Sequence, residues 1–334
     1  MRVLMFTTDK NILQENSEVS QRMVEYSKLV EKLDILLIQK SNILSALKRG
    51  KKYEKPDLIS AQDPFETGFI GWKLARYFGA KLQLQVHTDF MSPYFKKESL
   101  KNRVRVWLAK FLIPKANCIR VVSERIRKSL ELRFKNYDLG ITNLPIWVDV
   151  EKIKNSPIKI DLHKKYPQFD FIILMASRLT KEKNISTAIT TMSDVVVNYP
   201  KTGLIIVGDG SQRKALKSQI TRYKLQNNAI LEQWTTDLTS YYKTCDLFLL
   251  TSNYEGYGMT LIEASAAGCN IISTDVGIAD EVLEKENIFR QGDKKGLQTK
   301  IERALNGNIK PTKQINSCTR KEYLEKYRNM LYSI

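Results

Sequence analysis

The sequence predicts an α/β fold in which two doubly wound, Rossmann-like domains face each other across a cleft. Short apolar runs that favour strands alternate with helix-length segments, and this alternation occurs twice, on either side of a polar stretch. The chain also has 334 residues, which is more than one hydrophobic core usually serves at about 150 residues per domain. In open sheets of this class, ligands bind beyond the carboxyl ends of the strands. We therefore expect the functional residues in the turns from strand to helix.

The first series of strands predicts an N-terminal domain over residues 1–150. Each run is mainly apolar and precedes a segment of helical length, which is the pattern of βαβ units in a parallel sheet. The expected strands are RVLMF (2–6), DILLI (34–38), DLIS (57–60), LQLQV (82–86) and CIRVV (118–122).

The second series predicts a C-terminal domain over residues 151–318. It follows EKIKNSPIKIDLHKKYPQFD, a polar stretch without clear periodicity, which we interpret as a linker region. Residues 319–334 are predicted to form a terminal amphipathic helix, with a return to the N-terminal domain as one option. The expected strands are FIILMAS (171–177), GLIIVG (203–208), AILEQW (229–234), DLFLLTS (246–252) and NIISTD (270–275).

Composition limits the classes of partner. The net charge of +18 at pH 7 implies attraction to an anion, which leaves nucleic acid, an anionic lipid surface and a phosphorylated substrate as options. The basic excess is densest between Lys96 and Lys135. No apolar run approaches the roughly 20 residues of a bilayer-spanning helix, and the first residues resemble a strand more than a secretory signal. We therefore expect a cytoplasmic protein. Because the four cysteines form no CxxC pair, we expect neither a zinc site nor a disulfide framework but reduced thiols.

The stretch SNYEGYGMTLIEASAAG predicts a turn that opens an apolar helix after the strand DLFLLTS. Gly256 and Gly258 allow backbone N–H groups to approach a ligand at the helix N-terminus, which favours anions. Glu255 precedes this helix and Glu263 lies inside it, so their backbones are about 12 Å apart if the segment is helical. That separation exceeds the roughly 5 to 9.5 Å between the paired acids of a glycosidase. The two carboxylates instead suit the two ends of one long ligand, such as a diphosphate-linked sugar, although either alone is better explained as a solvated acid.

Two cations follow the first strand of the second series, in SRLTKEKNI. Alone, such a charged loop says little. At a strand end, however, the guanidinium of Arg178 and the ammonium of Lys183 are suited to neutralise a diphosphate leaving group. Gly208 lies in a second glycine turn, VGDG, for which a purely structural role is the alternative.

The order of SRLTKEKN, LIIVGDG, YYKTCDLFLLTSNYEGYGMTLIEASAAGCNIIST and VGIADEV resembles the family 4 retaining glycosyltransferases of the GT-B fold, over nearly all of residues 170–283. The most specific feature is a pair of glutamates separated by seven residues. The resemblance implies that Arg178 and Lys183 hold the donor diphosphate, that Glu255 binds the donor sugar and that Glu263 binds the nucleotide ribose. Further donor-binding residues implied by the resemblance are Gly208, Trp234, Gly256, Tyr257, Gly258, Met259 and Thr260.

The N-terminal half resembles this family less closely. QVHTDF places His87 at a strand end, where the family keeps a histidine beside the donor sugar, whereas a lone histidine is more often structural. The first loop lacks the paired glycines of many members, so Ser17 or Ser20 is a candidate for phosphate contacts there. Gln233 stands where a glycine is usual near the base pocket, which leaves uridine and guanosine both open.

The resemblance also implies an activity. It implies transfer of a hexose or N-acetylhexosamine from a nucleotide sugar, with retention at the anomeric carbon and with neither a metal nor another cofactor. The expected acceptor is a hydroxyl of a glycan or a lipid-diphosphate in cell-surface polysaccharide assembly. The alternatives are a nucleotide-sugar epimerase or phosphorylase, a non-catalytic subunit of the same fold, and a basic protein that binds nucleic acid or membrane, although no nucleic-acid recognition motif is present.

The segment LKNRVRVWLAKFLIP (100–114) predicts an amphipathic helix with basic residues beside an apolar stripe. One interpretation places the stripe against the sheet, as for any crossover helix. The other places the helix in an anionic membrane interface, with the protein peripheral on the inner face of the cell membrane. The stripe consists of Leu100, Val104, Trp107, Leu108 and Phe111, and its basic neighbours are Lys101, Arg103, Arg105 and Lys110.

Overall fold

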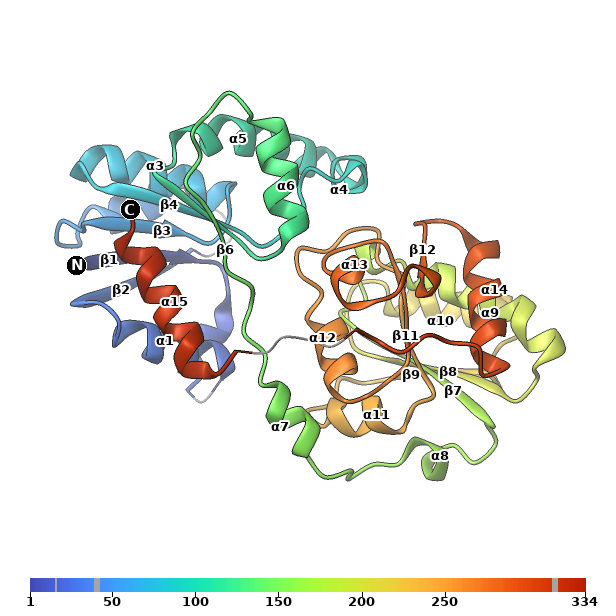
Figure 1. Ribbon diagram of the computed structural model, residues 1–334. Helices are drawn as coiled ribbons and strands as arrows, with labels where there is room; N and C mark the ends of the chain where they lie inside the picture. The colour runs from blue at the N-terminus through green and yellow to red at the C-terminus, as the bar shows by residue number, and fades with distance from the viewer. Residues whose placement is uncertain (16, 39–42, 314–317) are drawn as a thin grey trace. The chain divides into compact units, whose positions relative to one another are not determined.

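The computed structural model describes residues 1–15, 17–38, 43–313 and 318–334 (Figure 1). The chain divides into two compact units. Unit 1 comprises Met1–Trp147 and Cys318–Ile334, and unit 2 comprises Val148–Ser317. Each unit contains one six-stranded parallel sheet with intervening helices, which confirms the predicted α/β class with two doubly wound sheets.

The sheet of unit 1 has the strand order β2-β1-β3-β4-β5-β6. Its centre is apolar: Val3 on β1 lies opposite Leu33 on β2 and Leu58 on β3. All five predicted strands of this unit are confirmed, and β6 is an additional short edge strand. The strands are β1 (Arg2–Thr7), β2 (Lys32–Leu37), β3 (Leu58–Ala61), β4 (Lys81–Val86), β5 (Cys118–Val121) and β6 (Ile141–Asn143). The helices are η1 (Lys10–Leu13), α1 (Glu18–Ser27), α2 (Ile43–Gly50), α3 (Glu66–Phe78), α4 (Pro93–Glu98), α5 (Leu100–Leu112), η2 (Ile113–Lys115), α6 (Glu124–Arg133) and α15 (Arg320–Tyr332).

The terminal helix α15 packs in unit 1, beside α1 and the first strands (Figure 1). It begins with a capping box between Thr319 and Glu322, which satisfies backbone groups at its N-terminus. Tyr327 stacks on Tyr26 of α1 with ring centroids 3.9 Å apart, and the hydroxyls of Tyr26 and Tyr323 are 3.1 Å apart. The last residues of the chain therefore complete the core of the N-terminal unit.

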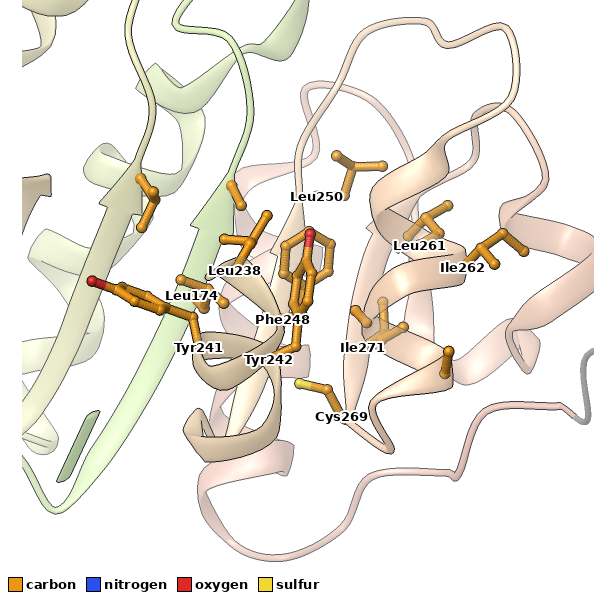
Figure 2. Packing of buried hydrophobic residues seen from close by; sticks show 14 of the residues in the cluster. Leu174, Leu238, Tyr241, Tyr242, Phe248, Leu250, Leu261, Ile262, Cys269 and Ile271 are labelled. Atoms are coloured by element: carbon orange, nitrogen blue, oxygen red, sulfur yellow. The ribbon is translucent and has the colours of Figure 1, made fainter. Parts of the chain in front are cut away.

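The sheet of unit 2 has the order β12-β11-β10-β7-β8-β9. One face is covered by α11 and α12, whose buried side chains pack on those of the central strands (Figure 2). All five predicted strands are confirmed here too. The strands are β7 (Phe171–Ala176), β8 (Thr202–Val207), β9 (Ala229–Glu232), β10 (Leu247–Leu250), β11 (Ile271–Thr274) and β12 (Ile288–Phe289). The helices are α7 (Val150–Asn155), α8 (Leu162–Lys165), η3 (Lys181–Lys183), α9 (Ile185–Asn198), α10 (Arg213–Arg222), α11 (Leu238–Thr244), α12 (Met259–Ala266), α13 (Ala279–Val282), η4 (Lys285–Asn287) and α14 (Lys294–Leu305).

The interpretation of residues 151–170 as a linker is wrong, because this segment forms part of the unit 2 core. It carries the short helices α7 and α8, and Leu162 and Phe169 are buried against the sheet. The backbone N–H of Leu162 also donates to the hydroxyl of Thr244 on α11 over 3.2 Å. Its polar composition concealed these few apolar residues, which are spaced too irregularly to show a helical or strand period.

Within the described residues, no helix is both long enough and apolar enough to cross a bilayer.

Candidate active site

The strand order of unit 2 brings three strand-end turns together. β7 lies between β10 and β8, so the turns after these parallel strands meet at one edge of the sheet. These turns contain the predicted residues Glu255, Lys183 and Gly208. The structure thus gathers at one sheet edge residues that are widely separated in the sequence.

Lys183 and Glu255 form the closest ion pair of this edge. The Lys183 Nζ donates to Glu255 Oε1 over 2.6 Å, and the two side chains are only 15% and 14% exposed. The Ser252 hydroxyl donates to the same carboxylate oxygen over 2.7 Å. Partial burial strengthens these charge-assisted contacts relative to a surface ion pair. Glu255 is therefore held in one orientation before any ligand arrives.

The backbone joins the two loops as well. The N–H of Asn253 donates to the carbonyl of Glu182 over 2.8 Å, and the Thr251 hydroxyl donates to the carbonyl of Lys183 over 2.9 Å. The loop after β7 is thus anchored to the end of β10, which explains why a lysine and a glutamate 72 positions apart meet.

Arg178 occupies the same loop but is held less firmly. Its guanidinium lies 3.4 Å from Glu182 and its side chain is 77% exposed. The carboxylate of Glu182 also accepts from the Thr180 hydroxyl over 2.6 Å. A single long contact on an exposed side chain costs little to break, so Arg178 can reorient toward an anion at this edge.

The glycine turn after β10 opens α12 as predicted. Gly258 has a φ of +95°, a left-handed conformation that favours glycine, and Leu261 N–H donates to its carbonyl over 2.9 Å. Gly256 and Tyr257 precede this position, and Met259 and Thr260 are the first residues of the helix. Their backbone N–H groups lie at the positive end of the α12 dipole, where an anion is stabilised.

Glu263 lies one turn further along α12 and is oriented by a tyrosine that the sequence did not reveal. The Tyr242 hydroxyl donates to Glu263 Oε2 over 3.1 Å. Burial, reinforced by the Glu263 charge, raises the pKa of Tyr242 well above its ordinary value, so the phenol remains a donor. Figure 2 shows Tyr242 beside Phe248, whose ring meets it edge-on with centroids 5.3 Å apart. The position of Glu263 is thus set from α11 as well as from its own helix.

Gly208 has a packing reason to be glycine. Its φ is +150°, and a Cβ built there would lie 1.9 Å from the carbonyl oxygen of Ser177 in the loop after β7. Leu179 N–H donates to the carbonyl of Asp209 over 2.8 Å, which holds the two loops together. The turn therefore supports the Lys183 loop whether or not it touches a ligand.

A second polar cluster at β9 was not predicted. Glu232 accepts from Lys165, and from Tyr241 over 2.6 Å, and it also pairs with Tyr166. Burial raises the pKa of Glu232, but the hydrogen bonds from Lys165 and its other partners lower it more, so the net pKa lies below the ordinary value. Trp234 follows this strand and is 57% exposed.

His87 belongs to unit 1, directly after β4, and its surroundings determine its tautomer. Its Nε2 lies 3.1 Å from Gln85 Oε1, which also accepts from the Arg120 guanidinium over 3.1 Å. Arginine can only donate, so the oxygen of Gln85 faces Arg120 and the histidine Nε2 must carry the proton. Burial lowers the pKa of His87 to about 3, and the charges of Arg120 and Arg22 contribute. His87 is therefore neutral near pH 7, with Nδ1 as its acceptor nitrogen.

Ser17 has a structural use in the first loop. Its Oγ caps α1 by accepting from Ser20 N–H over 3.0 Å, and it donates to the carbonyl of Asn11 over 2.6 Å. Both contacts are internal to this loop, so the hydroxyl proposed for a phosphate is already in use.

Each of the two units matches the sequence profile of a known protein family. Residues 4–151 match the sequence profile described as Glycosyltransferase Family 4, and residues 159–321 match the one described as Glycosyl transferases group 1. This chain belongs to the family 4 glycosyltransferases. Together the two profiles cover nearly the whole chain, so the resemblance first seen in residues 170–283 extends to unit 1.

Individual relatives agree with this assignment. The chain is 24% identical over 241 residues to an alpha-monoglucosyldiacylglycerol synthase of Streptococcus pneumoniae, which is 68% of this chain and 54% of the relative. It is 27% identical over 252 residues to an Escherichia coli UDP-Gal:alpha-D-GlcNAc-diphosphoundecaprenol alpha-1,3-galactosyltransferase, which is 73% of this chain and 64% of the relative. The chain thus spans somewhat more than half of the length of these curated relatives.

A solved structure shows the same fold. The Anabaena protein Alr3699/HepE in complex with UDP-glucose superposes with a TM-score of 0.73 at 19% sequence identity, over 100% of this chain and 94% of that chain. At this identity, the likeness supports the fold alone, which is that of the GT-B glycosyltransferases.

Proposed function

We propose that this family 4 glycosyltransferase moves a hexose or N-acetylhexosamine from a UDP- or GDP-linked sugar to a hydroxyl of a glycan or lipid-linked acceptor. The transfer retains the anomeric configuration, needs no divalent metal and serves cell-surface polysaccharide assembly at the cytoplasmic face of the membrane. The observation that carries the proposal is the partly buried pair of Lys183 and Glu255, 2.6 Å apart beside the N-terminus of α12. A cation, a fixed carboxylate and a helix dipole at one edge of the sheet suit the diphosphate and the sugar of a nucleotide sugar.

In this mechanism the diphosphate is the group that needs stabilisation. The bond between the anomeric carbon and the diphosphate oxygen breaks, and the electron pair leaves with the phosphate. Lys183, Arg178 and the α12 N–H groups neutralise the developing charge, which is the part a metal ion plays elsewhere. Because these groups are positioned before the reaction, they need little rearrangement in the transition state.

The acceptor hydroxyl then bonds to the anomeric carbon from the face that the diphosphate leaves. Its proton passes to the departing diphosphate oxygen, so the atoms balance without a nucleophile from the protein. Glu255 already accepts two hydrogen bonds on one oxygen. This suits a group that positions sugar hydroxyls and stabilises positive charge better than one that attacks carbon.

Two further residues have proposed roles in donor binding. Glu263, oriented by Tyr242, accepts hydrogen bonds from the ribose hydroxyls. His87 is neutral with Nδ1 as acceptor, so it binds a hydroxyl of the donor sugar rather than a phosphate. The names of the two relatives include a lipid, diacylglycerol in one and diphosphoundecaprenol in the other, which supports a lipid-linked acceptor for this chain.

The test begins with donor identity. In a thermal-shift panel of UDP, GDP and their sugars, only the nucleotides of one base should raise the melting temperature. A ligand that binds the folded state and not the unfolded chain stabilises the folded state. Transfer is then measured with that donor, in the presence and absence of EDTA. Arg178→Ala and Lys183→Ala should each lower kcat/KM by roughly 10²- to 10³-fold, the scale of removing one preorganised charge-stabilising group.

Lys181→Ala is the matched control, because Lys181 lies in the same short helix with an exposed side chain. It should leave kcat/KM within about twofold, as expected for a surface change. Near-normal turnover in both Arg178→Ala and Lys183→Ala would refute the mechanism. Interconversion of the nucleotide sugar without an acceptor would instead identify an epimerase.

A further inference from the structure

Helix α5 of unit 1 is apolar on two opposite faces. One face is buried in the unit and contains Val106, Ala109 and Leu112 together with Asn102. The stripe predicted from the sequence lies roughly half a turn away, at about 100° per residue, and most of it faces solvent. Its exposed fractions are 75% for Leu100, 64% for Val104, 67% for Trp107 and 36% for Phe111. The interpretation that placed this stripe against the sheet is therefore wrong.

Helix α3 continues the same surface. It packs beside α5 (Figure 1), and Trp72 of α3 meets Phe111 edge-on with ring centroids 5.3 Å apart. Phe111 also stacks with Trp107 at 6.1 Å, and Trp72 lies 5.9 Å from Phe69. A continuous aromatic row thus crosses both helices. We call the surface formed by Leu100, Val104, Trp107, Phe111 and Trp72 the α3–α5 face.

Cations border the α3–α5 face on the α3 side and at the end of α5. Lys73 Nζ lies 4.8 Å from the centroid of Trp72, and the Arg76 guanidinium lies 5.5 Å from it. Lys115 Nζ lies 4.2 Å from the centroid of Phe111. These side chains lie over the aromatic rings with their charged ends in water, as amphipathic side chains do at an interface.

A further group of cations lies around Lys110 of α5. Burial lowers the pKa of Lys110, and the nearby positive charges of Arg133 and Lys96 lower it further. Arg133 and Lys96 therefore lie near enough to Lys110 for their like charges to repel it. An anionic surface placed here would relieve this repulsion between like charges.

We propose that the α3–α5 face docks unit 1 onto an anionic phospholipid bilayer. In this arrangement α5 lies in the plane of the interface, its outer apolar stripe enters the headgroup and acyl boundary, and the surrounding lysines and arginines contact lipid phosphates. Tryptophan is also the side chain most typical of that interface. The proposal goes beyond sugar transfer, because none of the residues that form the α3–α5 face is among the proposed donor-binding residues.

Charge distinguishes a bilayer from the other occupants of such a face. A second copy of this chain would bring two cationic borders together, which is unfavourable. A nucleic acid would satisfy the cations but leave the apolar stripe in contact with water. Only an anionic lipid surface offers both a negative layer for the border and an apolar layer for Val104 and Trp107.

The test is partitioning of the full chain onto vesicles of phosphatidylcholine with about 30% phosphatidylglycerol, with phosphatidylcholine alone as reference. Binding is expected on the anionic vesicles at about 50 mM salt and should weaken strongly at about 500 mM, where charges are screened. Val104→Glu should lower the partition coefficient at least tenfold. Val197→Glu is its matched control, because Val197 lies on α9 of unit 2, is 76% exposed and receives the same charge change.

The cationic border has its own pair of variants. Lys110→Gln combined with Lys115→Gln should lower partitioning about 25-fold, at about fivefold per basic residue. Lys214→Gln combined with Lys217→Gln, on exposed positions of α10, removes the same charge elsewhere and should have little effect. Trp107→Phe should retain binding but show a smaller vesicle-induced blue shift of tryptophan emission, because Trp72 remains on the same face.

Equal partitioning of Val104→Glu and Val197→Glu would overturn the proposal, as would equal binding of the wild-type chain to both kinds of vesicle. A concentration-dependent dimer that Val104→Glu dissociates would also overturn it and assign the face to a second copy. The thermal shift with the donor nucleotide, which should be unchanged in Val104→Glu, verifies folding and separates this result from failure of the proposed activity.

Discussion

Lowering the pH from about 7.5 to about 5 is expected to destabilise this protein through His87. Its pKa is about 3 in the folded state, against an ordinary value of 6.5. Between these values the unfolded chain binds a proton that the folded chain does not. Stability from the neutral imidazole is therefore fully present above about pH 6.5 and is lost progressively down to about pH 3. At about pH 5 the pH lies about 1.5 units below the ordinary pKa, so the free energy of unfolding is lower by about 2 kcal/mol.

The assay uses the fact that the chain has two histidines. Urea unfolding of the wild-type chain, His87→Asn and His163→Asn is measured over this pH range. The difference in free energy of unfolding between the wild-type chain and His87→Asn should change by about 2 kcal/mol between about pH 7.5 and about pH 5. His163→Asn is the comparison variant for the second histidine, whose side chain is 41% exposed and whose Nε2 lies 3.1 Å from Asp246. The wild-type chain has to be compared with His87→Asn because other groups also respond to pH. Burial raises the pKa of Asp63 and Asp89, so these two carboxyl groups favour the folded state on acidification.

The imidazole NMR spectrum gives a direct check. The ring signals of His87 should not titrate between about pH 5 and 8 and should show the tautomer protonated at Nε2. A midpoint for His87 between about pH 6 and 7 would refute both the burial argument and the tautomer assigned through Arg120 and Gln85.

Two further predictions concern unit 2. Gly208→Ala should lower the free energy of unfolding by more than about 2 kcal/mol, because its Cβ would meet the Ser177 carbonyl. Gly268→Ala is the control: no atom lies within 4 Å of the added Cβ, so it should cost only about 1 kcal/mol for its left-handed backbone. Equal losses of the two variants in urea unfolding would contradict this prediction. Tyr242→Phe should weaken binding of the donor nucleotide about fivefold in calorimetry, because Glu263 loses a hydrogen bond worth about 1 kcal/mol, and an unchanged affinity would show that Tyr242 does not orient Glu263.

The central strands of both sheets could be predicted because their sequences carry the information locally. Runs such as FIILMA in β7 are almost entirely buried, so hydrophobicity alone identifies them. The missed strands, β6 and β12, have three and two residues. Strands this short are defined by their neighbours in the sheet rather than by a pattern of their own.

The face of α5 could not be predicted for a different reason. Periodicity shows that a helix has an apolar stripe, but α5 has two. The larger residues of the outer stripe, such as Trp107, dominated the prediction. The inner stripe is centred on Ala109, which is fully buried and small enough to let the helix approach the rest of the unit closely.

The sequence indicated which residues are candidates for the site but not which of them contact one another. Glu255 and Glu263 could be recognised from their spacing around the glycine turn, and Lys183 from its place after a strand. Their contacts depend on the strand order, because β10 pairs with the distant strand β7 as well as with its sequence neighbour β11. The Tyr242 contact to Glu263 likewise requires α11 and α12 to pack together.

Arg120 connects the end of the chain to the predicted sugar-binding histidine. Its guanidinium donates to Gln85, which fixes His87, and to the hydroxyl of Tyr323 on α15 over 3.0 Å. It also donates to the carbonyl of Leu144 over 3.2 Å, beside the end of unit 1. A buried cation is costly to leave with fewer partners. Loss of α15 would remove the Tyr323 hydroxyl and leave Arg120 with its partners on Gln85 and Leu144. The terminal helix thus has a part in setting the state of His87 although it lies far from it in the sequence.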